Sequence, residues 1–99
     1  MASLTTQLQV EIIKALAHPA RLEIAQALSK GERCVSDLVE LVGSDMSTVS
    51  KHLRLMREAG WIDCEKKGQQ VFYHLGCDCL PTFLDCIAAI GQGGTCSDC

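Results

Sequence analysis

The stretch that decides the fold lies at residues 45–60 and reads DMSTVSKHLRLMREAG. Its apolar side chains recur at helical spacing and predict a helix with one buried face, formed by Val49, Leu53 and Met56. Asp45, or Ser44 before it, can accept hydrogen bonds from the free N–H groups of the first turn. Gly60 favours the chain reversal that ends a helix. The opposite face carries hydroxyl and charged side chains, namely Ser47, Ser50, Lys51, Arg54 and Glu58.

Three shorter helices are predicted before this stretch. The first begins near Leu4 and ends at the His18-Pro19 pair, because the residue before a proline is pushed out of the helical region. The proline can then open a second helix, where its missing N–H is harmless, and Gly31 ends that helix. Apolar spacing predicts a third helix over 35–42.

The chain after residue 60 predicts a hairpin and a last helix. Residues 61–65 and 70–75 alternate between apolar and polar, and a basic, Gly-containing tip at 66–69 joins them. The last helix begins near Pro81 and ends at the glycines from residue 91 onward. We therefore expect a mainly α chain with a small β-hairpin, in which five helices and a two-stranded wing form a winged helix-turn-helix.

Charge is unevenly distributed along the chain. The formal net charge of −3, taken alone, argues against a nucleic-acid binder. Residues 46–74, however, carry five Lys and Arg against three Asp and Glu, a net +2, and the other residues carry −5. A helix with small polar and basic side chains on one face fits the major groove of double-stranded DNA, and a basic hairpin tip can reach the neighbouring phosphates.

Length and composition limit the function further. With 99 residues, 47% of them hydrophobic, the chain is expected to fold as one domain too small for a deep substrate cleft, so we do not expect an enzyme. No apolar run approaches the ~20 residues of a membrane span, and we expect a cytoplasmic protein without membrane contact. We divide the chain into a domain for DNA binding and dimerisation at 1–91 and a Cys-containing tail at 92–99.

Cysteine is the strongest compositional signal. The chain has seven cysteines, and five of them lie at 77–99. In a reducing compartment, an odd number of clustered thiols indicates metal or redox chemistry rather than a disulfide framework. The cysteines are Cys34, Cys64, Cys77, Cys79, Cys86, Cys96 and Cys99.

Several blocks of sequence together resemble one family. The blocks are HPARLEI at 18–24, GERCVSDL at 31–38, STVSKHL at 47–53, LMREAGWI at 55–62 and the VFYHL strand at 71–75. They resemble the ArsR/SmtB metal-responsive repressors. The resemblance implies a homodimer through the first and last helices, which binds a two-fold operator in double-stranded DNA and leaves it when an inducer binds.

The resemblance also implies roles for residues of the expected DNA-binding face. The expected base readers are Ser47, Thr48, Ser50 and His52. The expected phosphate contacts are Lys51 and Arg54 on the same helix and Lys66, Lys67 and Gln70 on the wing. Met46 departs from the pattern, because the family often has a polar residue there, and it either touches a thymine methyl or packs against the turn.

The inducer site implied by the resemblance lies in the C-terminal cysteine cluster. The third helix keeps only Cys34 of the family's three-cysteine run, so Cys34 is a weak candidate. All-thiolate ligation favours thiophilic ions, As(III) first, with Sb(III), Cd(II), Pb(II) and others open. We expect Cys77 and Cys79 to bind together with Cys96 or Cys99. Cys86 is either a core residue or a ligand across the dimer, and Cys64 is expected to be a small buried side chain.

Two other functions remain open from the sequence. The first is a repressor of the same fold that responds to oxidants through disulfides or persulfides at the paired cysteines. The second is a thiolate-rich metal-buffering module without DNA binding. An enzyme is the weakest interpretation, because no His or carboxylate stands beside a cysteine at a recognisable spacing and no cofactor loop is present.

Overall fold

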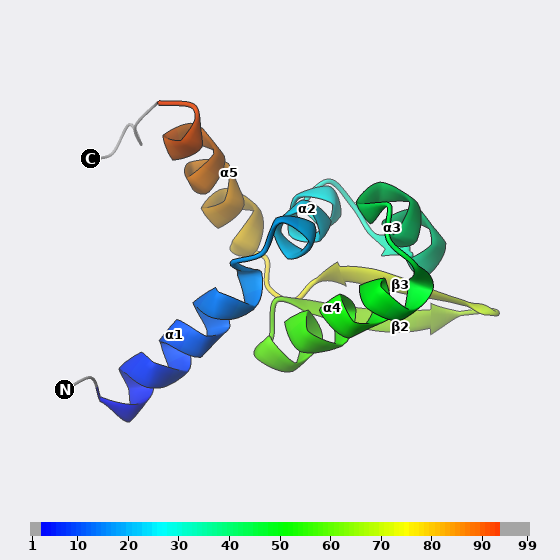
Figure 1. Cartoon of the computed structure of the whole chain (residues 1–99), viewed down its shortest axis with the longest axis horizontal. Helices are drawn as coiled ribbons and strands as arrows, with labels where there is room; N and C mark the ends of the chain where they lie inside the picture. The colour runs from blue at the N-terminus through cyan, green and yellow to red at the C-terminus, as the bar shows by residue number, and fades with distance from the viewer. Residues whose placement is uncertain (1–2, 94–99) are drawn as a thin grey trace.

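The computed structural model describes residues 3–93, which form five helices and three strands (Figure 1). In chain order these are α1 (Leu4–Leu16), α2 (Pro19–Leu28), β1 (Arg33–Cys34), α3 (Val35–Val42), α4 (Met46–Ala59), β2 (Ile62–Lys67), β3 (Gln70–Leu75) and α5 (Leu80–Gly91). The winged helix-turn-helix predicted from the sequence is confirmed, and α3 and α4 occupy the residues expected for them.

The helix ends follow local signals in the sequence. His18 caps α2 with its imidazole, whose Nδ1 accepts a hydrogen bond from the N–H of Ala20 at 3.1 Å. Asp45 caps α4, because its Oδ1 accepts a hydrogen bond from the N–H of Thr48 at 2.8 Å. Gly60 ends α4 in the left-handed conformation, at φ 92°, which a side chain would disfavour.

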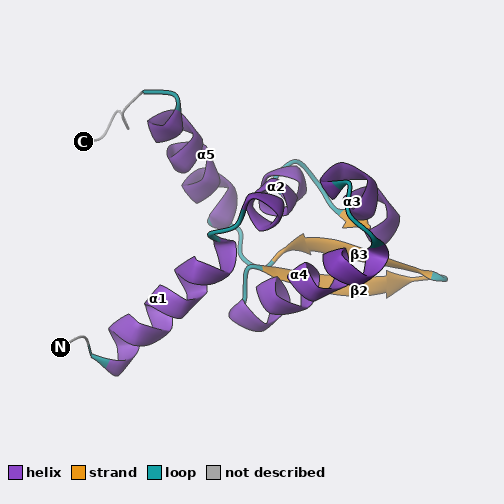
Figure 2. Ribbon diagram, in the orientation of Figure 1, coloured by secondary structure: helices purple, strands orange, loops and turns teal. Residues whose placement is uncertain are grey.

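The hairpin is confirmed, and a third strand joins it that the sequence did not indicate. The antiparallel sheet has the order β1-β3-β2, as Figure 2 shows, with Arg33 opposite Tyr73. Strand β1 contains two residues, too few for the alternation that marks a strand in a sequence. The turn at the hairpin tip is also shorter than the expected residues 66–69, because Lys67 already pairs with Gln70.

The core joins helices α2, α3 and α4 to the sheet. Its fully buried side chains are aliphatic or Met, and the largest are Ile24, Leu38, Leu53, Met56, Ile62 and Val49. The inward stripe predicted for α4 is therefore confirmed. Because this stripe is packed on α2 and α3, the polar face of the same helix is held outward in a fixed orientation.

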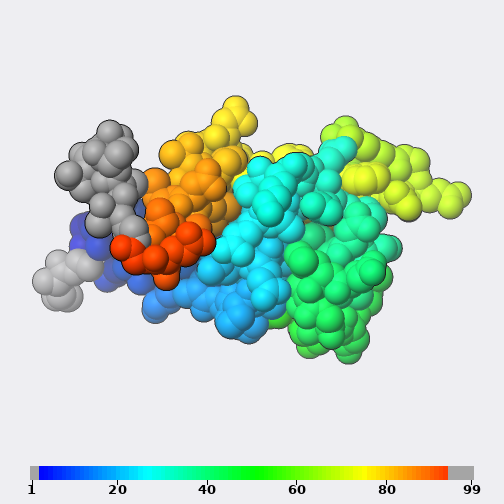
Figure 3. All heavy atoms as spheres, turned by 90° about the horizontal axis from the view of Figure 1, so that it is seen from above, coloured from blue at the N-terminus to red at the C-terminus, as the bar shows by residue number. Residues whose placement is uncertain are grey.

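Helices α1 and α5 lie at one end of the molecule, and the β2–β3 hairpin projects at the other, as Figures 1 and 3 show. Both helices leave large apolar side chains in solvent. On α1, Leu4 is 72%, Leu8 58% and Ile13 59% exposed, and Ile90 on α5 is 63% exposed. No helix of residues 3–93 is long and apolar enough to cross a bilayer.

Candidate functional site

The outer face of α4 presents the polar side chains that the sequence placed there. Five of the six expected contacts on this helix are exposed, namely Ser47, Thr48, Ser50, Lys51 and Arg54. Arg54 lies along the helix surface, where its Nε donates a hydrogen bond to Oε1 of Glu58 at 3.1 Å. The face thus combines small hydroxyl groups with two cations, which is suitable for base edges and phosphates.

His52 differs from these residues because it packs inward. Its side chain is half-buried, and its ring centroid lies 4.6 Å from that of His18, at the start of α2. Burial lowers the pKa of His52, and the nearby His18 and Arg21 lower it further. The structure thus gives His52 a packing contact between α4 and α2, and its role as a base reader stays a prediction.

The wing carries two exposed lysines that differ in their partners. Lys67 donates a hydrogen bond to Glu32 through Nζ at 2.7 Å, and Nζ also lies 5.5 Å from the centroid of the Phe72 ring. The hydrogen bond to Glu32 raises the pKa of Lys67. Lys66 and Gln70 are exposed at the tip. To bind a phosphate, as the sequence predicts, Lys67 would therefore have to give up its hydrogen bond to Glu32.

A groove of about 500 Å³ lies between α4 and the wing. Ser50, Arg54, Arg57, Glu58 and Tyr73 line it. Sequence reasoning gave a DNA-binding role to Ser50 and Arg54 only, and it placed Glu58 on the same helix face without a role. Arg57 lies one turn after Arg54 on the same face, a spacing that could have revealed it, whereas nothing in the strand pattern singled out Tyr73. Burial raises the pKa of Tyr73, so its phenol stays a hydrogen-bond donor.

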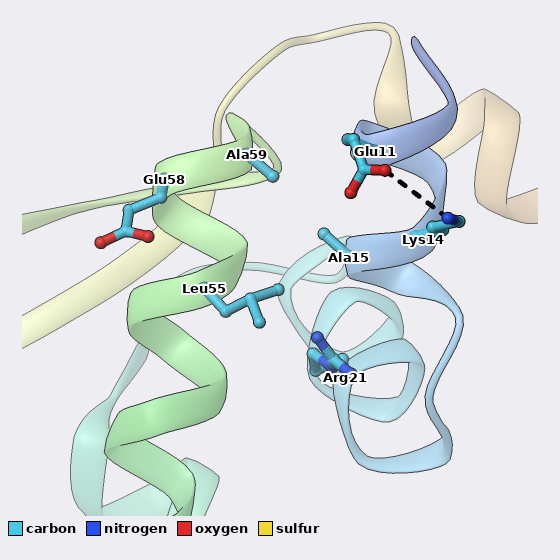
Figure 4. Close-up of a pocket in the computed structure, with 7 residues that line it drawn as sticks. All are labelled: Glu11, Lys14, Ala15, Arg21, Leu55, Glu58 and Ala59. Atoms are coloured by element: carbon cyan, nitrogen blue, oxygen red, sulfur yellow. Dashed lines mark ion pairs between the residues drawn. The ribbon is translucent and has the colours of Figure 1, made fainter. Parts of the chain in front are cut away.

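A second hollow, of about 340 Å³, separates the end of α1 from α4 (Figure 4). Its lining comes from three helices: Glu11, Lys14, Ala15, Arg21, Leu55, Glu58 and Ala59. The charges in it partly pair with each other, since Nζ of Lys14 lies 3.5 Å from Oε1 of Glu11. The hollow has no thiol in its lining, so it is not a site for a thiophilic ion.

The thiol pair Cys77–Cys79 lies in the connection between β3 and α5. Both side chains are exposed, and their sulfur atoms are 2.9 Å apart. The thiol and the backbone N–H of Cys79 donate hydrogen bonds toward the sulfur of Cys77 and lower its pKa. The same thiol contact raises the pKa of Cys79. Two thiolates on one ion with bonds of ~2.3 Å lie ~4 Å apart, so a small opening of this pair suffices.

The other cysteines do not complete a site with this pair in the described part of the chain. Cys86 is half-buried on α5. Cys34 and Cys64 are half-buried in the sheet, opposite the successive residues Phe72 and Tyr73, and therefore face opposite sides. Cys96 and Cys99 lie outside the described residues, as does most of the predicted tail. Within residues 3–93 no group of three or more potential metal ligands is assembled.

Comparison with known proteins identifies the family. A family model described as bacterial regulatory protein, arsR family, matches residues 18–63, which run from the cap of α2 into β2. The chain is 37% identical over 79 residues to the biofilm growth-associated repressor of Agrobacterium fabrum, covering 80% of this chain and 68% of that protein. The chain belongs to the ArsR family.

Two further relatives are named as repressors. The arsenical resistance operon repressor of Staphylococcus xylosus is 33% identical over 90 residues, 88% of this chain and 86% of that protein. The HTH-type transcriptional repressor SmtB of Mycobacterium tuberculosis is 35% identical over 83 residues, 83% of this chain and 62% of that repressor. The match to this chain thus spans about three fifths of the length of SmtB.

A solved structure confirms the fold. Reduced HlyU from Vibrio cholerae superposes with a TM-score of 0.78 at 27% identity, covering 87% of this chain and 90% of that one. As a member of this family, the chain is a DNA-binding transcriptional regulator and not an enzyme.

Proposed function

We propose that this ArsR-family regulator is a cytoplasmic, dimeric repressor that leaves its operator when a thiophilic metalloid, As(III) first, binds Cys77 and Cys79. The observation that carries the proposal is the exposed thiol pair, with sulfur atoms 2.9 Å apart, at the start of a helix. The role named for the Staphylococcus xylosus relative, repression of an arsenical resistance operon, supports the same inducer.

The binding step needs no oxidant. Each As–S bond replaces an As–OH bond of arsenous acid, and the displaced hydroxyl leaves as water with the thiol proton. Cys77 and Cys79 supply two sulfurs, and we propose that Cys96 or Cys99 supplies the third. The neutral reaction thus converts As(OH)3 and three thiols into As(SR)3 and three waters. Sb(III), Cd(II) and Pb(II) remain alternatives, because soft thiolate ligands also suit those ions.

The dimer interface in this proposal is formed by α1 and α5. The apolar residues that these helices expose would be covered by the same residues of a second copy, as in a two-fold interface. Each copy then presents one α4 to the major groove, with phosphates held by Lys51, Arg54 and the wing. The two helices must match the ~34 Å repeat of the groove, so a change in α5 packing alters DNA affinity.

The test is fluorescence anisotropy of the reduced protein on double-stranded DNA from upstream of its own gene. We expect tight binding, and release when arsenite is added at one equivalent per protomer. Cys77→Ser and Cys79→Ser should bind DNA normally and resist release, whereas Cys64→Ser, a half-buried thiol of β2, should behave as the wild type. Release of the Cys77→Ser protein by arsenite would contradict the proposal.

A second candidate function is a thiol-redox repressor, which the same 2.9 Å sulfur pair favours. Two thiols and a hydroperoxide would give a disulfide, an alcohol and water, so the hydroperoxide accepts the two electrons. The reduced state named for the HlyU relative is in keeping with such chemistry. Release by hydroperoxide and not by arsenite would favour this candidate. No DNA binding at low salt would instead favour the metal-buffering module.

A further inference from the structure

Trp61 connects the elements that a repressor of this kind has to couple. It is the single tryptophan of the chain, it directly follows the glycine that ends α4, and it is 5% exposed. Its backbone N–H donates a hydrogen bond to the carbonyl of Met56 in the last turn of α4, at 3.0 Å. Trp61 is thus fixed to the end of the helix that carries the DNA-binding face.

The side chain of Trp61 contacts both α1 and α5, the helices at the end of the molecule opposite the wing. Its Nε1–H donates a hydrogen bond to the carbonyl oxygen of Ile12 on α1 at 2.6 Å. Its ring centroid lies 5.8 Å from that of Phe83 on α5. One residue therefore contacts both helices that expose the apolar side chains of the proposed dimer interface.

The thiol pair is attached to Trp61 through one residue. The N–H of Gly76, the neighbour of Cys77, donates a hydrogen bond to the carbonyl of Trp61 at 2.9 Å. A Cβ at position 76 would lie 2.6 Å from the carbonyl oxygen of Gly60, so the two chain segments touch without room for a side chain. A displacement of Cys77 toward α4 therefore moves the end of α4, because no gap between the two segments can absorb it.

We propose that Trp61 couples ligand binding at Cys77 and Cys79 to the position of α4 relative to α1 and α5. The inference rests on the proposed function, since it needs a ligand at the thiol pair. When an ion binds, the two sulfurs move apart from 2.9 Å toward the ~4 Å that separates two thiolates on one ion. Gly76 then shifts with Cys77 and moves the carbonyl of Trp61. The indole then changes its contacts with Ile12 and Phe83, and α4 turns relative to the dimer helices.

The first experiment uses the wild-type protein and the emission of this one tryptophan. Titration with sodium arsenite should shift or quench the emission in proportion to bound arsenic, which equilibrium dialysis measures separately. Cys77→Ser should abolish both changes, and excess dithiol should reverse them in the wild type. Bound arsenite with unchanged emission would overturn the coupling role while the proposed function stands. Absence of bound arsenite would overturn both.

The second experiment separates coupling from structure with Trp61→Phe, which keeps an aromatic ring and loses the Nε1–H donor. We expect arsenite binding and ligand-free DNA affinity within about threefold of the wild type. Coupling between two sites commonly changes affinity by about 5- to 150-fold. Arsenite should weaken DNA binding of the wild type within that range, and that of Trp61→Phe by less than about threefold.

Two further variants keep the second experiment decisive if Trp61→Phe is poorly folded. Phe83→Leu removes the ring contact on α5 and should also reduce the effect of arsenite on DNA affinity. Val39→Ala, in a half-buried position of α3 that packs against the core, is the matched control for lost packing and should keep the full effect. Full coupling in both Trp61→Phe and Phe83→Leu would overturn the inference.

Discussion

Lys67 on the wing is paired with Glu32, which lies 35 residues earlier in the chain just before β1, with 2.7 Å between Nζ and Oε1. Nearly half of each side chain remains exposed, at 45% and 43%. An ion pair in such a position contributes little to stability, because solvent screens it. Its larger effect is on DNA binding, since a phosphate has to compete with Glu32 for Lys67 and is itself repelled by that carboxylate.

Replacing Glu32 with Gln should therefore strengthen DNA binding. We expect the affinity to rise about two- to fivefold, the range of an exposed ion pair. Where Lys67 gains a phosphate contact, the slope of log affinity against log salt should steepen by roughly 0.9. Anisotropy at several salt concentrations measures both quantities.

Glu11→Gln is the matched control for the Glu32 variant. It removes the same charge from an exposed ion pair on α1, at the end of the molecule away from the wing (Figure 1). It should leave affinity and salt slope close to those of the wild type. Equal gains in the two variants would show that net charge, and not the Lys67–Glu32 contact, controls the affinity.

Gly76→Ala should destabilise the protein, because the added methyl group meets the carbonyl oxygen of Gly60 at 2.6 Å. Overpacking of this kind costs about 1–3 kcal/mol of unfolding free energy. Gly91→Ala is the control, since nothing lies within 4 Å of a Cβ there. Urea unfolding should give a lower midpoint for the first variant and an unchanged or slightly higher one for the second. Equal midpoints would show that β3 and the end of α4 are not packed this closely.

Helix α4 shows how much the sequence determines locally. Its cap at Asp45, its apolar stripe and its terminal Gly60 are all signals within 16 residues, and the structure reproduces each. Strand β1 shows the opposite case. Arg33 and Cys34 become a strand only because β3 offers them partners about 40 residues later, which no local pattern reveals.

The candidate site likewise has some features that the local sequence determines and others that depend on distant contacts. Exposure of Ser47, Lys51 and Arg54 follows from helical periodicity. The inward position of His52 does not, because it depends on the meeting of α4 with the start of α2. The 2.9 Å approach of the thiol pair depends on side-chain orientation in a connection, and a two-residue spacing could not specify it.

The thiol pair predicts a difference in reactivity. Cys77 has a lowered pKa because Cys79 donates hydrogen bonds to its sulfur, so Cys77 should be alkylated by iodoacetamide at lower pH than Cys79. Cys79→Ala removes the thiol donor and should shift the alkylation profile of Cys77 to higher pH. Mass spectrometry of peptides after timed labelling measures this shift. Cys64→Ala, a change on β2, should leave the profile of Cys77 in place. An unshifted profile in Cys79→Ala would show that the two sulfurs are not in contact in solution.

The contact between His18 and His52 predicts a pH dependence of stability. The folded-state pKa of His52 lies below its ordinary value of 6.5, because burial, His18 and Arg21 disfavour its proton. Between that lowered pKa and 6.5 the unfolded chain binds more protons than the folded one, so unfolding free energy falls as pH falls through this window. Urea unfolding from pH 7.5 to 5.5 should show this loss in the wild type and a smaller one in His52→Gln. Ser50→Ala, on the same helix without a titratable group, should follow the wild type. Equal losses in the wild type and His52→Gln would exclude His52 as their source.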